Sequence, residues 1–222
     1  KLFVFDISTQ SLTNAKNLII ENLNNIQIKF ISKISEIPKF IDLIIISTTA
    51  DVRVSLVSKF FNKKNFIIKA WVLEKLLCQS LNDLKSLENF FSENKKAWVN
   101  MPRRMMPWHQ KIYSYLPKNQ LLNVEVIGSN WGLACNSVHF FDLVSWWTGE
   151  TLVSIENNGL EKDWFVSKRK GFYEINGSLT GKFSSGSSLK LVSENKEMDF
   201  SIHLRSSKDQ WYFDYSNNGF FG

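Results

Sequence analysis

The first half of the chain alternates short apolar runs with segments of helical periodicity. Residues 2–5 are a continuous apolar run, which is typical of a strand covered on both faces. Apolar side chains recur at helical spacing over residues 11–23. The same patterns predict further strands at 26–31, 40–46, 65–73 and 98–101, and further helices at 51–61 and from Ser80 to about residue 94. Strands that alternate with helices predict right-handed crossovers and a parallel α/β sheet.

The pattern changes near residue 100. The elements predicted beyond it are a helix at 103–116, a strand at 122–129, a helix within 131–149 and strand-like runs at 151–156, 171–183, 188–194 and 198–215. Asn176-Gly177 and Ser185-Gly186 predict turns between antiparallel strands. We therefore expect two domains, residues 1–100 and residues 101–222. The second is an α+β domain with a large open, mostly antiparallel sheet on its helices.

Two predicted helix boundaries rest on local signals. Ser80, with Asp83 three residues later, forms a capping box that starts the helix ending near residue 94. In the 131–149 segment, Asn136 or Ser137 is expected to cap the helix start, and Gly149 to end it.

Polar side chains follow three of the predicted strands in the first half. They are Asp6 after 2–5, Ser47, Thr48 and Thr49 after 40–46, and Glu74 and Lys75 after 65–73. Ligands of parallel α/β sheets bind beyond the carboxyl ends of the strands, so these side chains are expected to gather along one edge. A polar strand end without a ligand is the alternative for each of them.

The helix predicted within residues 131–149 places polar groups among aromatic ones. At helical spacing Cys135, His139, Asp142 or Leu143, and Trp146 share one stripe. His139 is either a general acid or base, or a helix histidine hydrogen-bonded to Asp142. Cys135 is either a thiol with a lowered pKa at the helix start or a buried structural cysteine.

Two other side chains are candidates for a site. Lys75 is flanked by Glu74 and the apolar pair Leu76-Leu77. Desolvation there would lower the pKa of its amine toward use as a proton donor or acceptor, and an exposed, solvated lysine is the alternative. Trp131 precedes the helix and is expected at a pocket, where aromatic rings stack on sugars.

Composition excludes some classes of protein. The histidines, His109, His139 and His203, stand at no ligand spacing and the two cysteines are far apart, so no metal site is expected. No apolar stretch is long enough to span a bilayer, and with only two cysteines we expect a soluble cytoplasmic protein. The net charge of +6 raises nucleic acid as a partner, but the 27 basic residues are scattered and this partner is not favoured.

The glycines are unevenly distributed. The first of the ten is Gly128, so a glycine-rich phosphate loop cannot lie in the first half. Because the chain also starts with Lys1 inside one apolar run and ends inside another, we expect a fragment of a longer protein.

Four segments, in order, resemble the glucose-fructose oxidoreductase and inositol dehydrogenase family, the Gfo/Idh/MocA group. They are DLIIISTTADVR at 42–53, VLEKLLCQS at 72–80, VNMPRR at 99–104 and NWGLACNSVHFFDLVSWWTG at 130–149. The resemblance implies a Rossmann domain that binds NAD or NADP, here without its first strand and glycine loop. It also implies a second domain whose sheet often builds a homo-oligomer interface.

The resemblance also implies roles for individual residues. Lys75 matches the family lysine near the nicotinamide, and His139 matches a histidine that helps to move the substrate proton. Asp6 would bind the adenosine ribose and favour NAD, since a 2′-phosphate would be repelled there. The other residues assigned in this way are Ser47, Thr48, Thr49 and Glu74 for the cofactor, and Arg103, Trp131 and Asn136 for the substrate.

Two substitutions depart from the family pattern. Leu76 stands where the family has a proline after the lysine, and Cys135 stands where many members have an aspartate. Asn136 is a possible replacement for that polar contact. The favoured function is hydride transfer between a nicotinamide cofactor and a sugar, cyclitol or nucleotide-linked sugar. The alternative is a non-catalytic sugar- or nucleotide-binding homologue of the same fold.

Overall fold

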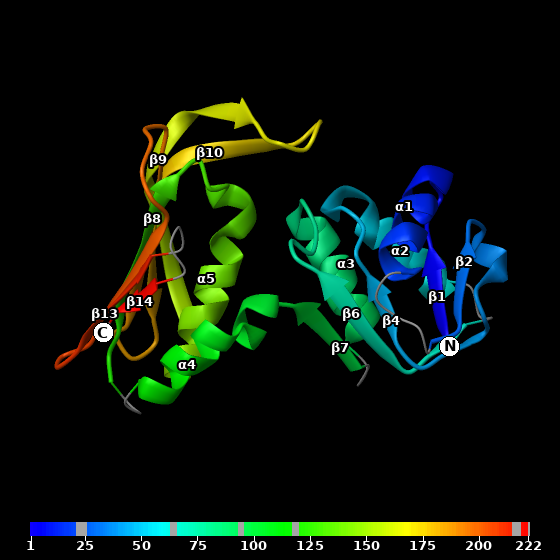
Figure 1. Ribbon diagram of the computed structural model, residues 1–222, viewed down its shortest axis with the longest axis horizontal. Coiled ribbons are helices and arrows are strands. Elements are labelled where there is room, and N and C mark those ends of the chain that lie inside the picture. Colours follow the sequence, from blue (N-terminus) through cyan, green and yellow to red (C-terminus); the bar gives the residue numbers. More distant parts are fainter. Residues whose placement is uncertain (21–25, 63–65, 93–95, 117–119, 215–218, 222) are drawn as a thin grey trace. The chain divides into compact units, whose positions relative to one another are not determined.

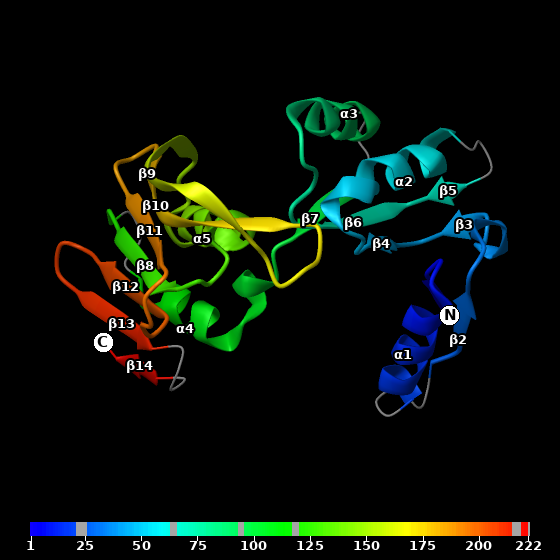
Figure 2. The ribbon, with the colours of Figure 1, turned by 90° about the horizontal axis from the view of Figure 1, so that it is seen from above.

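The computed structural model describes residues 1–20, 26–62, 66–92, 96–116, 120–214 and 219–221. The chain divides into two compact units, Lys1–Val99 and Asn100–Gly222. Figures 1 and 2 show the helices and strands of each unit.

The first unit alternates strands and helices, as the apolar pattern predicts. Its elements are β1 (Leu2–Phe5), α1 (Thr9–Ile20), β2 (Ile28–Ile31), a 3-10 turn (Ile34–Glu36), β3 (Phe40–Ile41), β4 (Ile44–Ile46), α2 (Ala50–Asn62), β5 (Ile67–Ile68), β6 (Ala70–Glu74), α3 (Leu81–Phe91) and β7 (Lys96–Asn100). The pairs β1–β2, β3–β5 and β4–β6 are all parallel. The parallel α/β class predicted for this half is therefore confirmed.

The described strands of the first unit form several short sheets rather than one long one. Their orders are β1-β2, β3-β5 and β4-β6-β7. The single strands predicted at 40–46 and 65–73 are wrong, because each is divided into two, at Asp42-Leu43 and at Lys69. Both breaks occur at matching positions of paired strands, and the Lys69 amine lies 2.6 Å from the Asp42 carboxylate across them. An apolar run in one chain segment does not reveal a bend that two segments share.

Helices α2 and α3 pack on β4 and β6 to form the core of the first unit. Its buried side chains are Ile46, Val57, Phe60, Trp71, Leu73 and Leu87. Trp71 stacks on Phe61 with ring centroids 5.1 Å apart, and Phe61 also stacks on Phe90 at 5.0 Å. Ser80 caps α3 as predicted, because its hydroxyl accepts a hydrogen bond from the Asp83 backbone N–H at 3.1 Å. The expected end near residue 94 is too late: α3 ends at Phe91, and residues 93–95 lie outside the described residues.

The second unit is a helix-covered sheet. Its elements are a 3-10 turn η2 (Pro102–Met105), α4 (Pro107–Tyr115), β8 (Asn123–Ser129), α5 (Leu133–Thr148), β9 (Leu152–Val166), β10 (Tyr173–Phe183), β11 (Ser188–Glu194), β12 (Ser201–Arg205), β13 (Gln210–Asp214) and β14 (Gly219–Phe221). The described strands form one sheet in the order β14-β13-β12-β8-β11-β10-β9. Among the described strands of this sheet only β8 and β11 pair in parallel, so the predicted mostly antiparallel sheet is confirmed. Helix α5 packs on one face, alongside β10 and β11 (Figure 1).

Alternation along the central strands builds the core of this unit. On β8 and β11 every second side chain is buried, including Val124, Val126, Leu189 and Leu191. These side chains meet the apolar side of α5, from which Leu133, Phe140, Leu143 and Val144 are almost completely buried. The described residues of this core form a single apolar cluster.

Three predictions for the second unit are wrong in detail. The helix expected at 103–116 is broken at Met106, because the residue before Pro107 is held extended at ψ 132°. Asn176-Gly177 is not a turn but lies inside β10, where the register with β9 shifts and Gly177 has φ +110°. The run 198–215 is a hairpin of β12 and β13, of which Tyr215 lies outside the described residues.

Candidate functional site

In the first unit, two of the predicted ligand-binding segments share one sheet edge. Strands β4 and β6 are parallel neighbours, with Ile46 opposite Leu73. The turn of residues 47–49 and the pair Glu74-Lys75 therefore leave the sheet at the same end. Glu74 and Lys75 are half-buried, and the peptide bond from Lys75 to Leu76 is cis.

Asp6 belongs to a different sheet. It follows β1, which pairs with β2, and its carboxylate accepts a hydrogen bond from the Ser8 backbone N–H at 2.8 Å. This contact lies just before the start of α1, which is an ordinary role for a short acidic side chain after a strand. The structure thus brings together the groups after β4 and β6, while the role of Asp6 in ribose binding stays a prediction.

Arg53 connects the two segments that share the sheet edge. It lies on α2 and is 1% exposed. Its guanidinium donates to the backbone carbonyls of Thr48, Leu76 and Leu77, the last at 3.1 Å. Burial lowers the pKa of the Arg53 guanidinium, and the negative charge of Glu74 opposes that shift. Sequence reasoning missed this residue, although Arg53, Val57 and Phe60 share the helical spacing of buried positions.

The side-chain hydroxyl of Thr48 lacks a hydrogen-bond partner among the residues that the structure describes. This oxygen, Oγ1, is buried. A buried hydroxyl normally has a partner, so an unsatisfied one beside the first turn of α2 fits a ligand with polar or anionic groups.

In the second unit, the start of α5 is held by an acidic side chain from the sheet. The N-cap is Gly132 with φ +79°, so the cap predicted from Asn136 or Ser137 is wrong. The Ala134 backbone N–H instead donates to Glu174 Oε2 on β10 at 2.9 Å, a long-range contact that no local signal encodes. Gly149 ends the helix in the left-handed conformation, as predicted.

Trp131 and Asn136 contact each other just before and within the first turn of α5. The Asn136 side-chain amide donates to the Trp131 backbone carbonyl at 2.9 Å. The Trp131 indole N–H donates to the Val192 carbonyl at 2.7 Å, and its ring packs edge-on against Phe140. Trp131 is thus a half-buried part of the core, and its substrate role stays a prediction.

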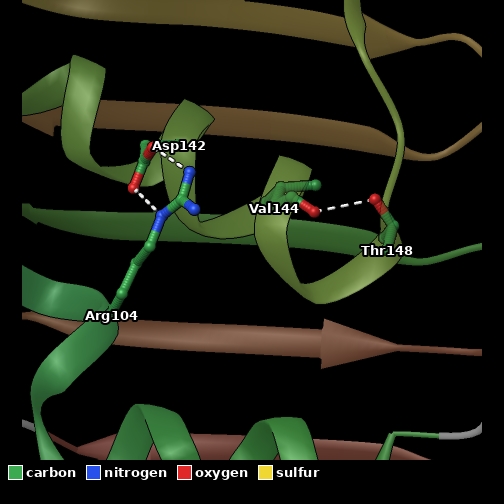
Figure 3. Close-up of polar contacts among 4 residues, drawn as sticks. All are labelled: Arg104, Asp142, Val144 and Thr148. Carbon is green, nitrogen blue, oxygen red and sulfur yellow. Dashed lines mark hydrogen bonds and ion pairs between the residues drawn. The ribbon is translucent and has the colours of Figure 1, made fainter. Parts of the chain in front are cut away.

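Asp142 is paired with an arginine from η2. Its carboxylate accepts hydrogen bonds from Arg104 Nε, at 2.7 Å, and from Arg104 Nη2. Figure 3 shows this two-point contact, together with the Thr148 hydroxyl donating to the Val144 carbonyl at 2.7 Å on the same helix. Two-point contacts between a guanidinium and a carboxylate are geometrically specific. Arg104 was not among the predicted site residues, although it adjoins Arg103 in the VNMPRR segment.

The remaining predicted groups of the second unit differ in exposure. His139 is 6% exposed on α5, whereas Cys135 is exposed, so the expectation of a buried structural cysteine is wrong. The Arg103 guanidinium lies over the Phe140 ring, 4.4 Å from its centroid. His109 on α4 is fully buried, and burial together with the Arg103 charge lowers its pKa from 6.5 to about 3.

Two structural features bear on the class of protein. Across the described ranges, no three His, Cys, Asp or Glu side chains are grouped so that they could hold a metal ion. None of the helices in the described part of the chain is long and apolar enough to cross a membrane.

The two-unit fold is shared with known oxidoreductases. No protein-family model and no curated protein matches the chain. Among solved structures, it is similar to UDP-N-acetylglucosamine 3-dehydrogenase GnnA from Acidithiobacillus ferrooxidans, with a TM-score of 0.67 and 13% identity over 99% of this chain and 70% of that one. It is also similar to a myo-inositol dehydrogenase from Corynebacterium glutamicum, with a TM-score of 0.67 and 14% identity over 96% of this chain and 67% of that one. A third similar structure is a super-repressor mutant of Gal80p from Saccharomyces cerevisiae, with a TM-score of 0.70 and 13% identity over 98% of this chain and 66% of that one.

These similarities establish the fold. The structural neighbours are of the Gfo/Idh/MocA type, so the resemblance noted in the sequence is confirmed at the level of the fold. The chain spans 66% to 70% of the length of the three solved chains named above.

Proposed function

We propose that this chain belongs to an NAD(P)-dependent oxidoreductase that transfers a hydride between a nicotinamide cofactor and a hydroxyl or carbonyl group of a sugar, cyclitol or nucleotide-linked sugar. The main support is the edge shared by β4 and β6. There Lys75 follows one strand, and the turn with the unsatisfied Thr48 hydroxyl follows the other. Ligands of open α/β sheets bind at such an edge.

The residues present at this edge fit part of a dinucleotide. In the proposal, Ser47, Thr48, Thr49 and Glu74 hold the cofactor, and Asp6 binds its adenosine ribose, which favours NAD over NADP. No glycine occurs before Gly128, so residues 1–127 do not themselves supply a glycine-rich loop for the pyrophosphate. The bound nicotinamide would supply the hydride acceptor or donor.

The side chains of this chain would handle the proton. Lys75 accepts the proton of the substrate hydroxyl during oxidation and returns it during reduction, and His139 is proposed to help move that proton. Positioned proton transfer of this kind contributes about 10²- to 10⁴-fold to a rate. Arg103, Trp131 and Asn136 are proposed to contact the substrate. A cytoplasmic homo-oligomer built through the sheet of the second unit completes the proposal.

Replacement of the lysine tests this function. Lys75→Met, made in the protein expressed from its complete coding sequence, is expected to lower kcat/KM by at least about 100-fold because it removes the proton acceptor. Lys69→Met is the matched control, since Lys69 is an exposed lysine whose ion pair with Asp42 lies away from the sheet edge. The assay follows nicotinamide absorbance over a panel of sugars and cyclitols. Unchanged turnover in Lys75→Met would exclude the mechanism.

A non-catalytic binding protein is the second candidate. It is supported by Cys135 and Leu76, which depart from the resemblance, and by the similarity to a protein described as a super-repressor. Calorimetry with NAD and NADP, together with the turnover assay, distinguishes the oxidoreductase from the binding protein. Tight binding without hydride transfer to any member of the panel would favour the binding protein, whereas turnover of one member would exclude it.

A further inference from the structure

Arg53 is a buried cation whose partners are backbone carbonyls. One partner, the Thr48 carbonyl, lies in the turn between β4 and α2. The others, the carbonyls of Leu76 and Leu77, belong to the segment directly after Lys75. The two sets are 28 and 29 residues apart in the sequence, and the guanidinium joins them just beyond the point where β4 and β6 stop pairing, at Ile46 and Leu73.

The chemistry of the side chain suits this connection. A guanidinium presents its N–H groups as a rigid planar fork, so Nη1 and Nη2 can donate to two separate segments at once. A lysine offers its donors from one nitrogen and cannot reproduce that geometry. Burying a charge is costly, so a buried guanidinium is weak evidence for extra stability.

The charges around Arg53 support a fixed arrangement. Against the effect of burial on the pKa of Arg53, Glu74, directly before Lys75, favours the charged guanidinium, as does Asp51 to a smaller extent. A negative side chain and two carbonyls next to the lysine therefore all favour one placement of the cation.

We propose that Arg53 is a positioning residue that locks the 47–49 turn to the segment carrying Lys75. The proposal rests on the function proposed above, in which the turn contacts the cofactor and Lys75 moves the proton. In this proposal Arg53 acts through these two segments and not by contact with a reactant. It keeps the amine and the turn at a constant separation, so that both act on one bound ligand.

Hydrogen exchange of the full chain tests the connection without requiring activity. In Arg53→Lys and Arg53→Gln, backbone amides of residues 47–50 and 75–78 are expected to exchange at least about tenfold faster, and in both segments together, because the bridging hydrogen bonds are lost. Val57→Ala is the control, since Val57 is fully buried one turn later on α2 and belongs to the apolar core of the first unit. It should change stability without loosening the two segments selectively.

Two results would overturn the proposal. One is full protection of both segments in Arg53→Lys, because the fork would then not be needed. The other is loosening of a single segment, or the same pattern in Val57→Ala, because Arg53 would then act as an ordinary core residue. Arg53→Gln keeps the test decisive if the lysine variant does not fold.

Kinetics separate this inference from the proposed function. If Lys75→Met abolishes turnover, Arg53→Lys is expected to lower kcat about tenfold or more per folded molecule and to change the pH profile of kcat. An unchanged kcat and pH profile would contradict positioning. If Lys75→Met has no effect, the proposed function fails, and the exchange of the two segments still decides whether Arg53 joins them.

Discussion

The two compact units differ in how their cores are built. Among the described residues, the main apolar cluster of the second unit contains 15 buried side chains and that of the first unit contains six. The second unit has a continuous sheet whose central strands bury alternate residues against α5, whereas the first has short parallel strands in separate sheets. The first unit therefore depends more on each single contact, both aromatic and polar.

Two arginines illustrate the same contrast. Arg53 in the first unit is buried and donates to carbonyls of two segments. Arg104 in the second unit is 39% exposed at its side chain and pairs with the carboxylate of Asp142. The first holds backbone segments in place, while the second adds a charge pair to a helix that the apolar core already holds.

The largest expected effect comes from the core of the first unit. Trp71→Ala removes a side chain that is 4% exposed and packs on Phe60, Phe61 and Phe91, so it should destabilise this unit by about 3–5 kcal/mol. With so few buried side chains, the unit is expected to lose its cooperative unfolding. Urea unfolding is monitored by pulse proteolysis, and the fragments are assigned by mass spectrometry. This measures the unfolding midpoint and the cooperativity of each unit separately.

Trp147→Ala is the matched variant in the second unit, where Trp147 is 6% exposed. It should shift the unfolding midpoint of that unit while leaving a cooperative transition. Equal loss of cooperativity in both variants would show that the sizes of the two clusters do not govern their sensitivity.

A smaller effect is expected from acid, through His109 in the second unit. His109 has a folded-state pKa lowered to about 3 by burial and by Arg103, so the folded protein keeps it neutral where the unfolded chain, at about 6.5, binds a proton. Its stabilisation is complete above pH 6.5 and is lost as the pH falls toward 3, with a slope approaching about 1.4 kcal/mol per pH unit. Urea midpoints of the second unit at pH 7, 5.5 and 4.5 measure this slope.

His109→Phe removes the titrating group and keeps an aromatic ring beside Trp147. In the native protein the ring centroids of His109 and Trp147 are 5.6 Å apart. The slope should become flatter in this variant. A slope equal to that of the native chain would mean that other groups cause the acid sensitivity.

The smallest effect is expected at the charge pair on α5. Arg104→Met leaves Asp142, only 15% exposed, without its two-point partner and should cost about 1 kcal/mol. Lys190→Met is the control, because its pair with Glu125 is more exposed and should contribute no more than about 0.5 kcal/mol. Urea midpoints at neutral pH compare the two, and equal losses would contradict a special role for the Arg104 contact.

The predictions that succeeded depend on local chemistry. Apolar periodicity located most helices and strands, because burial of one face repeats with the period of the element. Ser80 and Gly149 marked helix ends because capping involves residues within one turn. The parallel character of the first half and the mostly antiparallel sheet of the second were predicted from the order of these elements and the turns between them.

Only part of the candidate site could be predicted from the sequence pattern. Lys75 and the 47–49 turn could be placed at one edge because strand order implies it. Arg53 could have been found as a charged residue at a buried helical position, but its carbonyl partners could not, since they depend on how α2 packs.

Most helices and strands follow from local sequence, since backbone propensity and apolar period act over a few residues. The tertiary structure alone decided the bends shared at Asp42 and Lys69, the Glu174 contact that starts α5, and the carbonyl partners of Arg53. Each of these joins groups distant in sequence. The Glu174 and Arg53 contacts form because packing removes these groups from water and leaves each as the other's hydrogen-bond partner.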